Sequence, residues 1–375
     1  MKVALVCDWY RPRIGGIELH LQDLARELSK RGQDVVVITS TPGGRNFDGV
    51  RVRRIEAPRL PPFDLLYTPS GFRAVADAVA AERPDVVHAH VSIVSPTAIA
   101  GARAAHRQRL ATVVTFHSMV PSTRMLARGV GALLGAAAWT ARYTAVSQCV
   151  ALAMRPFAPA QSFDVLPNAI DVSAWRSEGA REPDDELRLV SVMRLNGKKR
   201  PLALVAMMRR LASSLPGVRI RLRIAGDGPQ RAIVARAIAR AQLRDRIELL
   251  GQCSRDRIRQ LLAESDAFVL AAVRESFGIA ALEARAAGLP VIAMSNSGVA
   301  EFIEHGREGL LARDDAELAA HVASLATDPE RLRAISNHNR LNPPPFDWPA
   351  VVDRHVAIYC EAMALRENVR ADSKR

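Results

Sequence analysis

Two acidic residues, Glu275 and Glu283, are separated by seven residues, and the pair Phe277-Gly278 lies just inside the first acid. The apolar spacing that follows predicts a helix starting near Phe277, with Glu275 in the loop before it and Glu283 about two turns along. The free amides of a first helical turn favour a phosphate group. Carboxylates accept paired hydrogen bonds from vicinal hydroxyls, so the acids suit two sugar rings flanking a diphosphate. The pattern indicates a nucleotide-sugar site.

For two isolated glutamates, the ordinary interpretation is a solvated loop residue and an exposed helix position. The flanking sequence favours a binding site instead. Apolar strands are predicted at Ala267 to Leu270 and at Leu289 to Ala293, and ligands of α/β proteins bind at the carboxyl ends of such strands.

In this setting the segment from Glu275 to Glu283 resembles the retaining glycosyltransferases of family 4, which have the GT-B fold and carry two acids at this spacing. The resemblance implies that Glu275 acts in catalysis and that Glu283 holds the ribose, and that the donor site includes Phe277, Gly278 and Ile279. It also implies retention of anomeric configuration and no metal or other cofactor. A front-side mechanism, in which the departing diphosphate takes the acceptor proton, suits these residues; an enzyme nucleophile is the alternative.

Two cations, Arg194 and Lys199, follow the first strand predicted in the second half of the chain. Close to a diphosphate they would neutralise the charge that develops as the sugar leaves, so both are predicted catalytic residues. A basic surface turn is the other interpretation. The family usually has Gly-Arg and then Lys-Gly, whereas here Met193 precedes the arginine and Arg200 follows the lysine. The register therefore lies between Lys198 and Lys199, and the five-residue spacing favours Lys199.

Glycines mark three further turns. Gly15-Gly16 opens a helix predicted from Ile17 to Arg31, Gly226 ends a strand, and Gly251 follows another. Such turns often need no ligand. The resemblance nevertheless implies that Gly15 and Gly16 lie opposite the donor and that Gly226 and Gly251 lie near the nucleotide. The Gly15-Gly16 spacing is unlike the dinucleotide fingerprint.

Three histidines stand at predicted strand ends: His88, His90 and His117. One such histidine is more often structural than catalytic. Family members have a histidine matching His117 beside the reacting sugar, so His117 is predicted to lie in the active site. Alternation places His88 and His90 on one strand face, but no third ligand is evident, so no metal site is predicted.

Strands alternate with helices throughout, which predicts parallel sheets covered on both faces. Six strands are predicted before the polar segment Ser177 to Glu186 and five after it, listed here in order: Val3 to Cys7, Asp34 to Thr39, Asp85 to Ala89, Thr112 to Phe116, Thr144 to Val146, Asp164 to Leu166, Leu187 to Met193, Ile220 to Ala225, Ile247 to Leu250, Ala267 to Leu270 and Val291 to Ala293. The 375 residues support two domains.

The predicted fold is therefore α/β of the GT-B type, two Rossmann-like domains facing a cleft. An acceptor-binding domain is expected at 1–180 and a nucleotide-sugar domain at 187–345. The resemblance, which covers about Val3 to Tyr359, implies that a last helix at 346–363 crosses back to the first domain; an ordinary terminal helix is the alternative.

The net charge of +13 calls for an anionic partner. No Asp or Glu occurs between Val86 and Phe163, an interval that includes the apolar segment Gly129 to Ala141. That segment is too short to span a bilayer; it could lie in a membrane interface, but core packing is favoured. A cytoplasmic protein is expected, because four scattered cysteines and the absence of a signal peptide indicate a reducing compartment. Peripheral attachment to the inner face of the membrane stays open.

The expected activity is hexosyl transfer from GDP-mannose or a UDP-sugar to a lipid-linked glycan, glycolipid or small hydroxyl acceptor. A GT-B enzyme that isomerises or phosphorolyses sugars is the nearer alternative. A basic nucleic-acid-binding protein is the more distant one, because aromatic content is only 5% and the basic residues are spread widely. No nucleic-acid partner is therefore expected.

Overall fold

The computed structural model describes residues 1–13, 15–61, 64–119, 124–177 and 185–372. Its internal contacts divide the chain into two units. Unit 1 comprises Met1–Ala169 with Trp348–Arg375, and unit 2 comprises Ile170–Asp347. The predicted linker, Ser177 to Glu186, lies mostly outside the described residues, and the chain already belongs to unit 2 from Ile170.

Unit 1 contains an eight-stranded sheet in the order β3-β4-β2-β1-β5-β6-β7-β8. All neighbouring strands are parallel except β3 and β4. The strands are β1 (Lys2–Cys7), β2 (Asp34–Thr39), β3 (Asn46–Phe47), β4 (Val50–Arg54), β5 (Val86–Val91), β6 (Ala111–Phe116), β7 (Arg142–Ala145) and β8 (Phe163–Val165). The six predicted strands are confirmed within two residues at each end. The short pair β3 and β4 was not predicted, because Val50–Arg54 carries three arginines.

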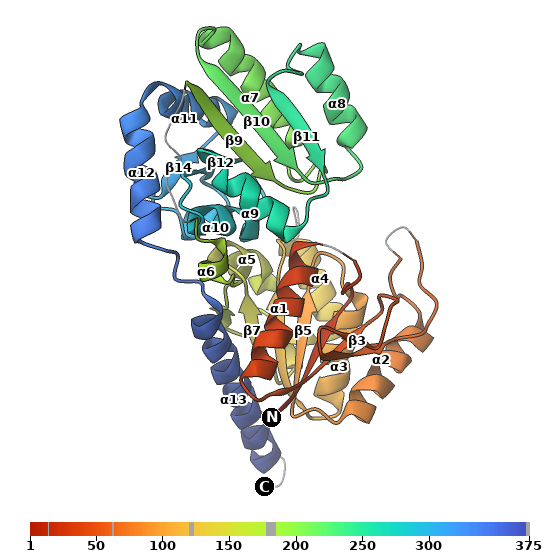
Figure 1. Ribbon diagram of the computed structural model, residues 1–375. Coiled ribbons are helices and arrows are strands. Elements are labelled where there is room, and N and C mark those ends of the chain that lie inside the picture. Colours follow the sequence, from red (N-terminus) through yellow and green to blue (C-terminus); the bar gives the residue numbers. More distant parts are fainter. Residues whose placement is uncertain (14, 62–63, 120–123, 178–184, 373–375) are drawn as a thin grey trace. The chain divides into compact units, whose positions relative to one another are not determined.

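Both faces of this sheet are buried. Along β1, Val3 and Leu5 pack with α1 (Gly16–Lys30) and α13 (Trp348–Asp372), whereas Ala4 and Val6 face the other way, into a second core cluster. That second cluster includes residues of α2 (Pro69–Glu82) and α3 (Pro96–Arg107). The strand alternation thus separates two helical layers (Figure 1).

Helix α1 ends as its sequence predicts. Gly32 has a φ of +76°, its amide bonds the carbonyl oxygen of Ser29 at 3.0 Å, and the next amide, of Gln33, bonds Leu28 O at 3.1 Å. This is a Schellman cap, which needs a left-handed residue that glycine supplies without strain.

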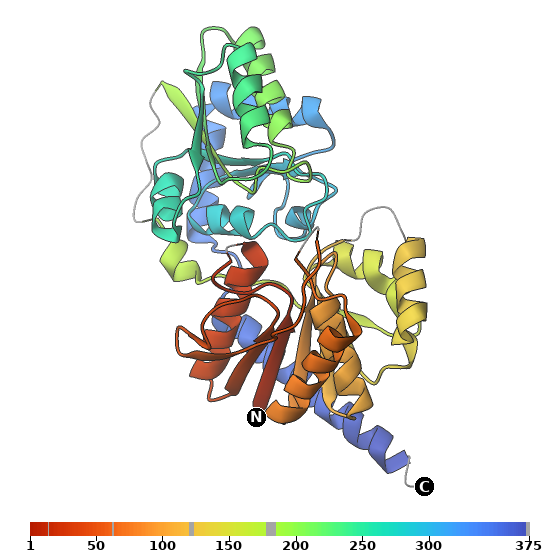
Figure 2. The same ribbon diagram turned by 90° about the vertical axis from the view of Figure 1, so that its right-hand side faces the viewer.

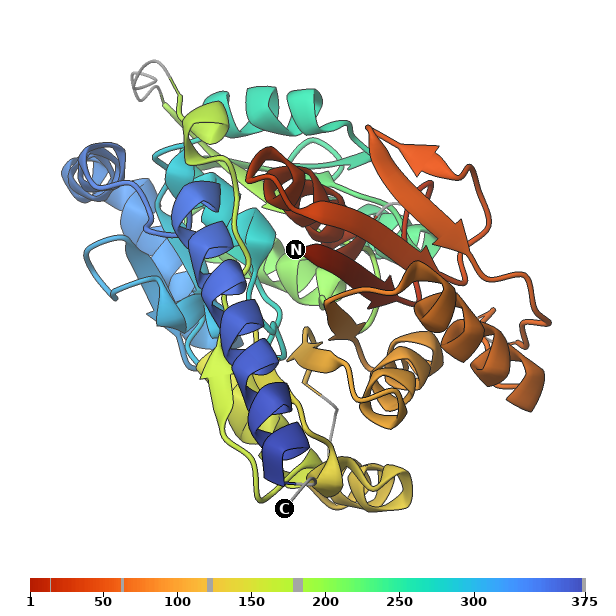
Figure 3. The same cartoon turned by 90° about the horizontal axis from the view of Figure 1, so that it is seen from below.

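The last helix, α13, packs on unit 1, where Trp348, Val351 and Tyr359 are buried in the same core cluster as β1. It runs to Asp372, past the predicted end at 363. Figure 3 shows α13 (dark blue) from below. The terminal helix therefore supplies part of the core of the unit in which the chain begins.

Unit 2 contains a six-stranded parallel sheet in the order β11-β10-β9-β12-β13-β14. Its strands are β9 (Glu186–Val192), β10 (Arg219–Ala225), β11 (Ile247–Gly251), β12 (Ala267–Leu270), β13 (Val291–Met294) and β14 (Gly309–Ala312). Its helices, which Figures 1 and 2 show around the sheet, are α6 (Val172–Trp175), α7 (Pro201–Ser214), α8 (Arg231–Arg240), α9 (Arg255–Ala263), α10 (Ile279–Ala286), α11 (Asp315–Thr327) and α12 (Pro329–Leu341). Only β14 was not predicted. The strand order reverses between β9 and β12, where ligands bind in such sheets.

The apolar segment Gly129 to Ala141 is divided between core and surface. It covers the end of α4 (Arg124–Leu134), a short 3₁₀ turn (Ala136–Ala138) and Trp139. Core packing is confirmed for Ala136 and Trp139, whereas Leu133 of α4 is 85% exposed. The expectation was wrong for Leu133, because its side chain lies on an exposed face of α4. In the described part of the chain, every helix is too short or too polar to cross a bilayer.

Candidate functional site

An ion pair joins two strand ends in unit 2. The Nζ atom of Lys199, just after β9, contacts Oε2 of Glu275, which follows β12. The backbone amide of Lys199 is held by the Asn196 side chain at 3.1 Å, which aims the lysine at this carboxylate. Glu275 is 8% exposed, so its charge is largely removed from water and gains most from a direct partner. The structure thus pairs Lys199, and not Lys198, with Glu275.

The loop that carries Glu275 is fixed by a second loop. The amide of Gly298 donates to the Glu275 carbonyl oxygen at 2.8 Å. A Cβ atom on Gly298 would lie 2.2 Å from the Ser276 carbonyl oxygen, and one on Gly278 would lie 2.6 Å from Val299. At Gly298 the two loops pack backbone against backbone, and at Gly278 the Val299 side chain fills the space, so neither glycine can gain a side chain without displacing Glu275 or its neighbours.

Helix α10 begins at Ile279, two residues later than predicted. Gly278 caps it in the left-handed conformation, with a φ of +92°. Phe277 lies before the helix, its ring buried against Phe302 and Phe346 at centroid distances of 5.4 and 5.7 Å. Glu283 is consequently about one turn into the helix rather than two, and it is half-buried.

The start of α10 has no side-chain cap, because the capping residue is Gly278. The carbonyl oxygen of Gly278 accepts the amides of Ala281 and Leu282 at 2.9 and 3.0 Å, which leaves the amides of Ile279 and Ala280 at the tip of the helix. A helix tip of this kind attracts anions through its amides and its dipole. It stands in the same short segment as Glu275.

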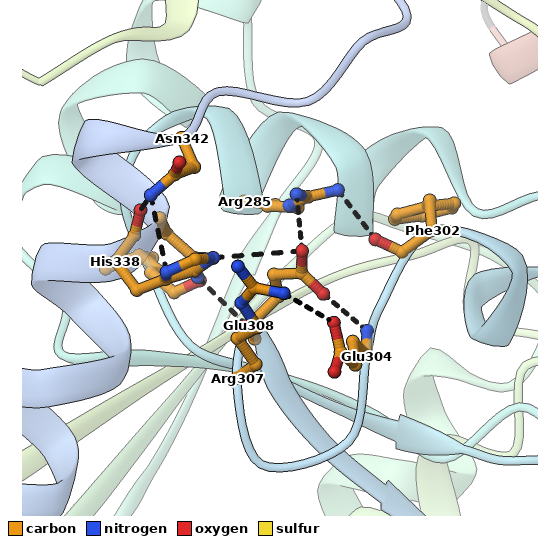
Figure 4. A network of polar contacts seen from close by, with 9 residues as sticks. Arg285, Phe302, Glu304, Arg307, Glu308, His338 and Asn342 are labelled. Atoms are coloured by element: carbon orange, nitrogen blue, oxygen red, sulfur yellow. Dashed lines mark hydrogen bonds and ion pairs between the residues drawn. The ribbon is translucent and has the colours of Figure 1, made fainter.

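A polar network anchors α10 near its C-terminal end (Figure 4). Arg285 is 5% exposed; it donates to the carbonyl oxygen of Phe302 at 2.7 Å and to Glu308 at 2.9 Å. His338 of α12 lies 3.9 Å from the same carboxylate. Burial lowers the pKa of Arg285, and the charge of Glu308 opposes that shift. The sequence pattern gave no sign of this network, because Arg285 falls among alanines on an apolar helix.

Three other cations near β9 have different environments. Arg194 is exposed, and within the described residues its side chain makes no hydrogen bond or ion pair. Arg200 binds both oxygens of Asp315 at 2.9 and 2.6 Å and the carbonyl oxygen of Ala271 at 3.0 Å. Burial lowers the pKa of Lys198. Arg194 is therefore available to a ligand, whereas Arg200 is committed to the fold.

The glycines at the ends of β10 and β11 are required by the backbone. The amide of Gly226 donates to Gly251 O at 2.7 Å. A Cβ atom on Gly226 would lie 1.9 Å from the Met193 carbonyl oxygen, and one on Gly228 would lie 2.5 Å from that of Leu195. The turn thus holds the ends of β9, β10 and β11 together, and this packing explains the glycines with or without a ligand.

In unit 1, Gly15 caps α1 and Gly16 is its first residue. The carboxylate of Glu18 folds back over Gly15, where a Cβ atom would lie 2.3 Å from Oε2. Arg13 binds Glu18 at 3.2 Å and stacks over Trp9 at 4.4 Å. The chain therefore places its own carboxylate at the helix tip that was predicted to lie opposite the donor.

The three predicted histidines meet inside unit 1. His88 and His90 are on the same face of β5, with ring centroids 3.9 Å apart, as alternation predicted. Nδ1 of His90 lies 2.9 Å from Nε2 of His117, which follows β6. Burial lowers the pKa of His117 to about 3, so the ring is neutral.

Two further histidines complete this cluster, and neither was singled out in the sequence. His20 of α1 and His355 of α13 are both buried, and His20 stacks on Trp348 at 5.2 Å. Across the described residues, no group of three His, Cys, Asp or Glu side chains has the arrangement of a metal site.

Two parallel-sheet α/β units of this kind define the GT-B class of glycosyltransferases, and solved structures share the fold. Anabaena HepE in complex with UDP superposes with a TM-score of 0.77, at 20% identity, over 96% of this chain and 100% of that one. Residues 176–341 match the family model of glycosyl transferases group 1, and residues 14–174 match that of glycosyltransferase family 4. The chain belongs to glycosyltransferase family 4.

Curated relatives carry the same activity class. The phosphatidylinositol N-acetylglucosaminyltransferase GPI3 subunit of Saccharomyces cerevisiae is 24% identical over 95% of this chain and 82% of its own length. Glycogen synthase of Mycobacterium tuberculosis is 29% identical over 96% of this chain and 95% of its own length. The protein is a glycosyltransferase.

Proposed function

We propose that the protein transfers a hexose from a nucleoside diphosphate sugar to a hydroxyl acceptor with retention of configuration and without a metal. The observation that carries this proposal is the ion pair between Lys199 and Glu275. Glu275 precedes the start of α10 by a few residues, and that helix start has no side-chain cap. The cation and the helix tip can stabilise a departing diphosphate, and the carboxylate can bind the sugar.

In the proposed reaction the bond from the anomeric carbon to the diphosphate breaks, and the acceptor oxygen bonds that carbon from the same side. The acceptor proton passes to the diphosphate. Lys199 and Arg194 offset the charge on the leaving diphosphate, and Glu275 contacts the transferred sugar. Since Lys199 is already held against Glu275, its ammonium needs little reorganisation as that charge develops.

The remaining donor contacts are assigned to unit 2. Glu283 holds the ribose, the tip at Gly278 and Ile279 binds phosphate, and Phe277 supports that tip from the core. Gly226 and Gly251 shape the nucleotide side. Unit 1, with His117, Gly15 and Gly16, is proposed as the acceptor-binding half, and His117 contacts the donor sugar.

Uracil is the proposed base of the donor nucleotide, because solved structures of HepE contain UDP, UDP with glucose, or UDP-glucose. GDP-mannose is the alternative donor. Thermal shifts with UDP, GDP, ADP and dTDP test this choice, since selective binding raises the unfolding midpoint by mass action. UDP should raise the unfolding midpoint of the wild type, and it should raise that of Glu283→Ala by less. A larger rise with GDP than with UDP would assign GDP-mannose as the donor.

Retention is tested by following the product's anomeric signal by NMR with a simple alcohol acceptor and the assigned donor. A product of the same anomeric configuration as the donor is expected, with full activity in EDTA. An inverted product, or activity that returns only with added Mg²⁺, would overturn this part of the proposal.

An anionic membrane surface is the proposed location of the acceptor. Met125 and Leu133 of α4 are each 85% exposed, Val130 is 40% exposed, and Arg128 on the same helix is also exposed. Apolar side chains beside a cation, in an interval of sequence that lacks acids, are complementary to anionic lipid. Of the relatives, the GPI3 subunit is named for a phosphatidylinositol substrate.

Cosedimentation with vesicles of phosphatidylcholine and phosphatidylglycerol tests this location. Leu133→Glu should lower the bound fraction, whereas the matched change Ile233→Glu, on α8 of unit 2 and 44% exposed, should not. Equal recovery of wild type in the supernatant with and without vesicles at low salt would contradict it.

A further inference from the structure

Arg231 of unit 2 lies at a helix end that disfavours a cation. It is the first residue of α8, a helix that has neither a side-chain cap nor an acid in its first turn. A positive charge at this end opposes the helix dipole and lowers the stability of the helix. Within the described residues the guanidinium makes no hydrogen bond or ion pair, so no carboxylate compensates for the charge. Residues that break a local rule in this way often serve a ligand.

The side chain of Arg231 is held by packing against the end of β11. A Cβ atom on Gly251 would lie 3.1 Å from its Nη1 atom and 3.8 Å from its Nη2 atom, so the guanidinium covers the glycine. The Nη1 atom is buried there, whereas the Nη2 and Nε atoms of this half-buried residue stay accessible to solvent. Arg231 therefore presents N–H donors, and no acceptor, beside Gly251.

The turn before α8 is poorly suited to a phosphate, because three of its amides are already bonded. The amide of Gly228 donates to Oδ1 of Asp227 at 2.7 Å, that of Gln230 to Leu195 O at 3.0 Å, and that of Arg231 to Gly228 O at 3.0 Å. The carboxylate of Asp227, which is exposed, would in addition repel a phosphate. A neutral acceptor, such as a carbonyl oxygen, is the better partner for Arg231.

The strand order indicates which part of the donor reaches Arg231. The strands β12, β9, β10 and β11 are parallel neighbours in that order, so their carboxyl ends form a row in which β11 lies about 14 Å from β12. In the proposed function the phosphates lie at the start of α10, after β12, and beside Arg194 and Lys199, after β9. On the other side of β12, the loop of Gly298 packs directly on the Ser276 backbone. The nucleoside therefore extends over β10 and β11, toward Arg231.

We propose that Arg231 selects the base of the donor nucleotide, by donating from Nη2 to a carbonyl oxygen at the outer edge of that base. Uracil, thymine and guanine each have a carbonyl oxygen at the edge where cytosine and adenine carry an amino group. An amino group is itself a donor, so a guanidinium cannot bind it there. This assignment rests on the proposed function and narrows its donor to a nucleotide whose base has that carbonyl oxygen.

Calorimetric titration of the full chain with UDP, CDP, GDP, ADP and inorganic pyrophosphate tests this assignment. CDP carries an amino group in place of the carbonyl oxygen of UDP, and ADP carries one in place of that of GDP. In the pair that contains the donor base, wild type should bind the carbonyl member about tenfold more tightly, and Arg231→Met should reduce this ratio to within about twofold. Its affinity for pyrophosphate should stay unchanged. Without ligand, Arg231→Met should unfold at the same midpoint as wild type or a higher one, because it removes a cation from the helix start.

The matched control is Arg240→Met, an exposed position at the other end of α8, which should leave every affinity unchanged. If Arg231→Met weakens both nucleotides of the pair and pyrophosphate by the same factor, Arg231 binds phosphate and the proposal is overturned. An unchanged ratio in Arg231→Met, or a wild type that does not discriminate within either pair, would overturn it as well. A wild type that binds none of the five ligands would instead overturn the proposed donor site, and this assignment with it.

Discussion

The two units contain buried polar clusters of different composition. In unit 1 the sheet face under α1 and α13 holds five buried histidines, His20, His88, His90, His117 and His355. In unit 2 the groups around α10 are charged: Lys199 pairs with Glu275, and Arg285 pairs with Glu308. Neutral rings need only hydrogen-bond partners, whereas buried charges need opposite charges.

This difference matches the proposed roles of the units. Charges that remain ionised across a wide pH range suit a site that must hold a diphosphate. Neutral histidines hydrogen-bond one another and their neighbours without needing counterions. The comparison predicts that unit 2 is sensitive to loss of single charges and that unit 1 is sensitive to acid.

The largest expected effect is on the folding of unit 2. Arg285→Met should lower the free energy of unfolding by about 3–5 kcal/mol, because it leaves Glu308 partly buried without its cation. Urea unfolding followed by circular dichroism measures this. The control Arg307→Ala, in an exposed pair with Glu304, should change it by about 0–1 kcal/mol. Equal effects of the two variants would mean that burial does not distinguish these pairs.

The next effect is on activity. Lys199→Met should lower kcat by about 100-fold to 1000-fold, as expected for loss of one preorganised charge at the leaving group. Lys198→Met, at the adjacent position, should retain activity within about threefold, since it does not contact Glu275. A larger loss of kcat in Lys198→Met than in Lys199→Met would assign the catalytic role to Lys198 instead.

Acid should destabilise unit 1. Burial lowers the pKa of His117 to about 3 and that of His355 to about 4, against 6.5 for the ordinary side chain. Below pH 6.5 the unfolded chain therefore binds more protons than the folded chain. The free energy of unfolding decreases as the pH is lowered, until the pH is below the pKa values of the folded state. Each histidine contributes a decrease of up to about 1.4 kcal/mol per pH unit.

One carboxyl opposes this trend. Burial raises the pKa of Asp8 to about 6 from 3.8, so the folded state binds the extra proton between these values and part of the loss is offset. Thermal midpoints from about pH 7.5 to 5 should fall in wild type and less in His355→Phe. His305→Gln, an exposed position in unit 2, should leave the slope unchanged. A flat wild-type profile would contradict neutral burial of the cluster.

The smallest expected effect concerns the loop contact that fixes Glu275. Gly298→Ala should destabilise unit 2 by about 1–3 kcal/mol, because a methyl group would overlap the Ser276 carbonyl oxygen. Gly217→Ala, where nothing lies within 4 Å of the added atom, should be close to neutral. Thermal midpoints of the two variants make the comparison, and an unaffected Gly298→Ala would show that the loops can separate freely.

The sequence by itself determined the alternation of strands and helices, the cap at Gly32 and the segment of the candidate donor site. These follow from local causes: apolar periodicity, left-handed glycine and the spacing of two acids on one short stretch. The strand β14 escaped prediction because four residues with a leading glycine carry little periodic signal. The start of α10 was placed at Phe277 because an apolar residue fits a helix pattern equally well when its ring packs before the helix.

Only the tertiary structure decided which groups meet. Lys199 and Glu275 are 76 residues apart in the chain, and local pattern could not choose Lys199 over Lys198. His20 and His355 join the strand-end histidines because α1 and α13 cover the same face of the sheet. Arg285 of α10 pairs with Glu308, which directly precedes β14. Such contacts depend on strand order and helix docking, which are set by burial across the whole unit rather than by neighbours in sequence.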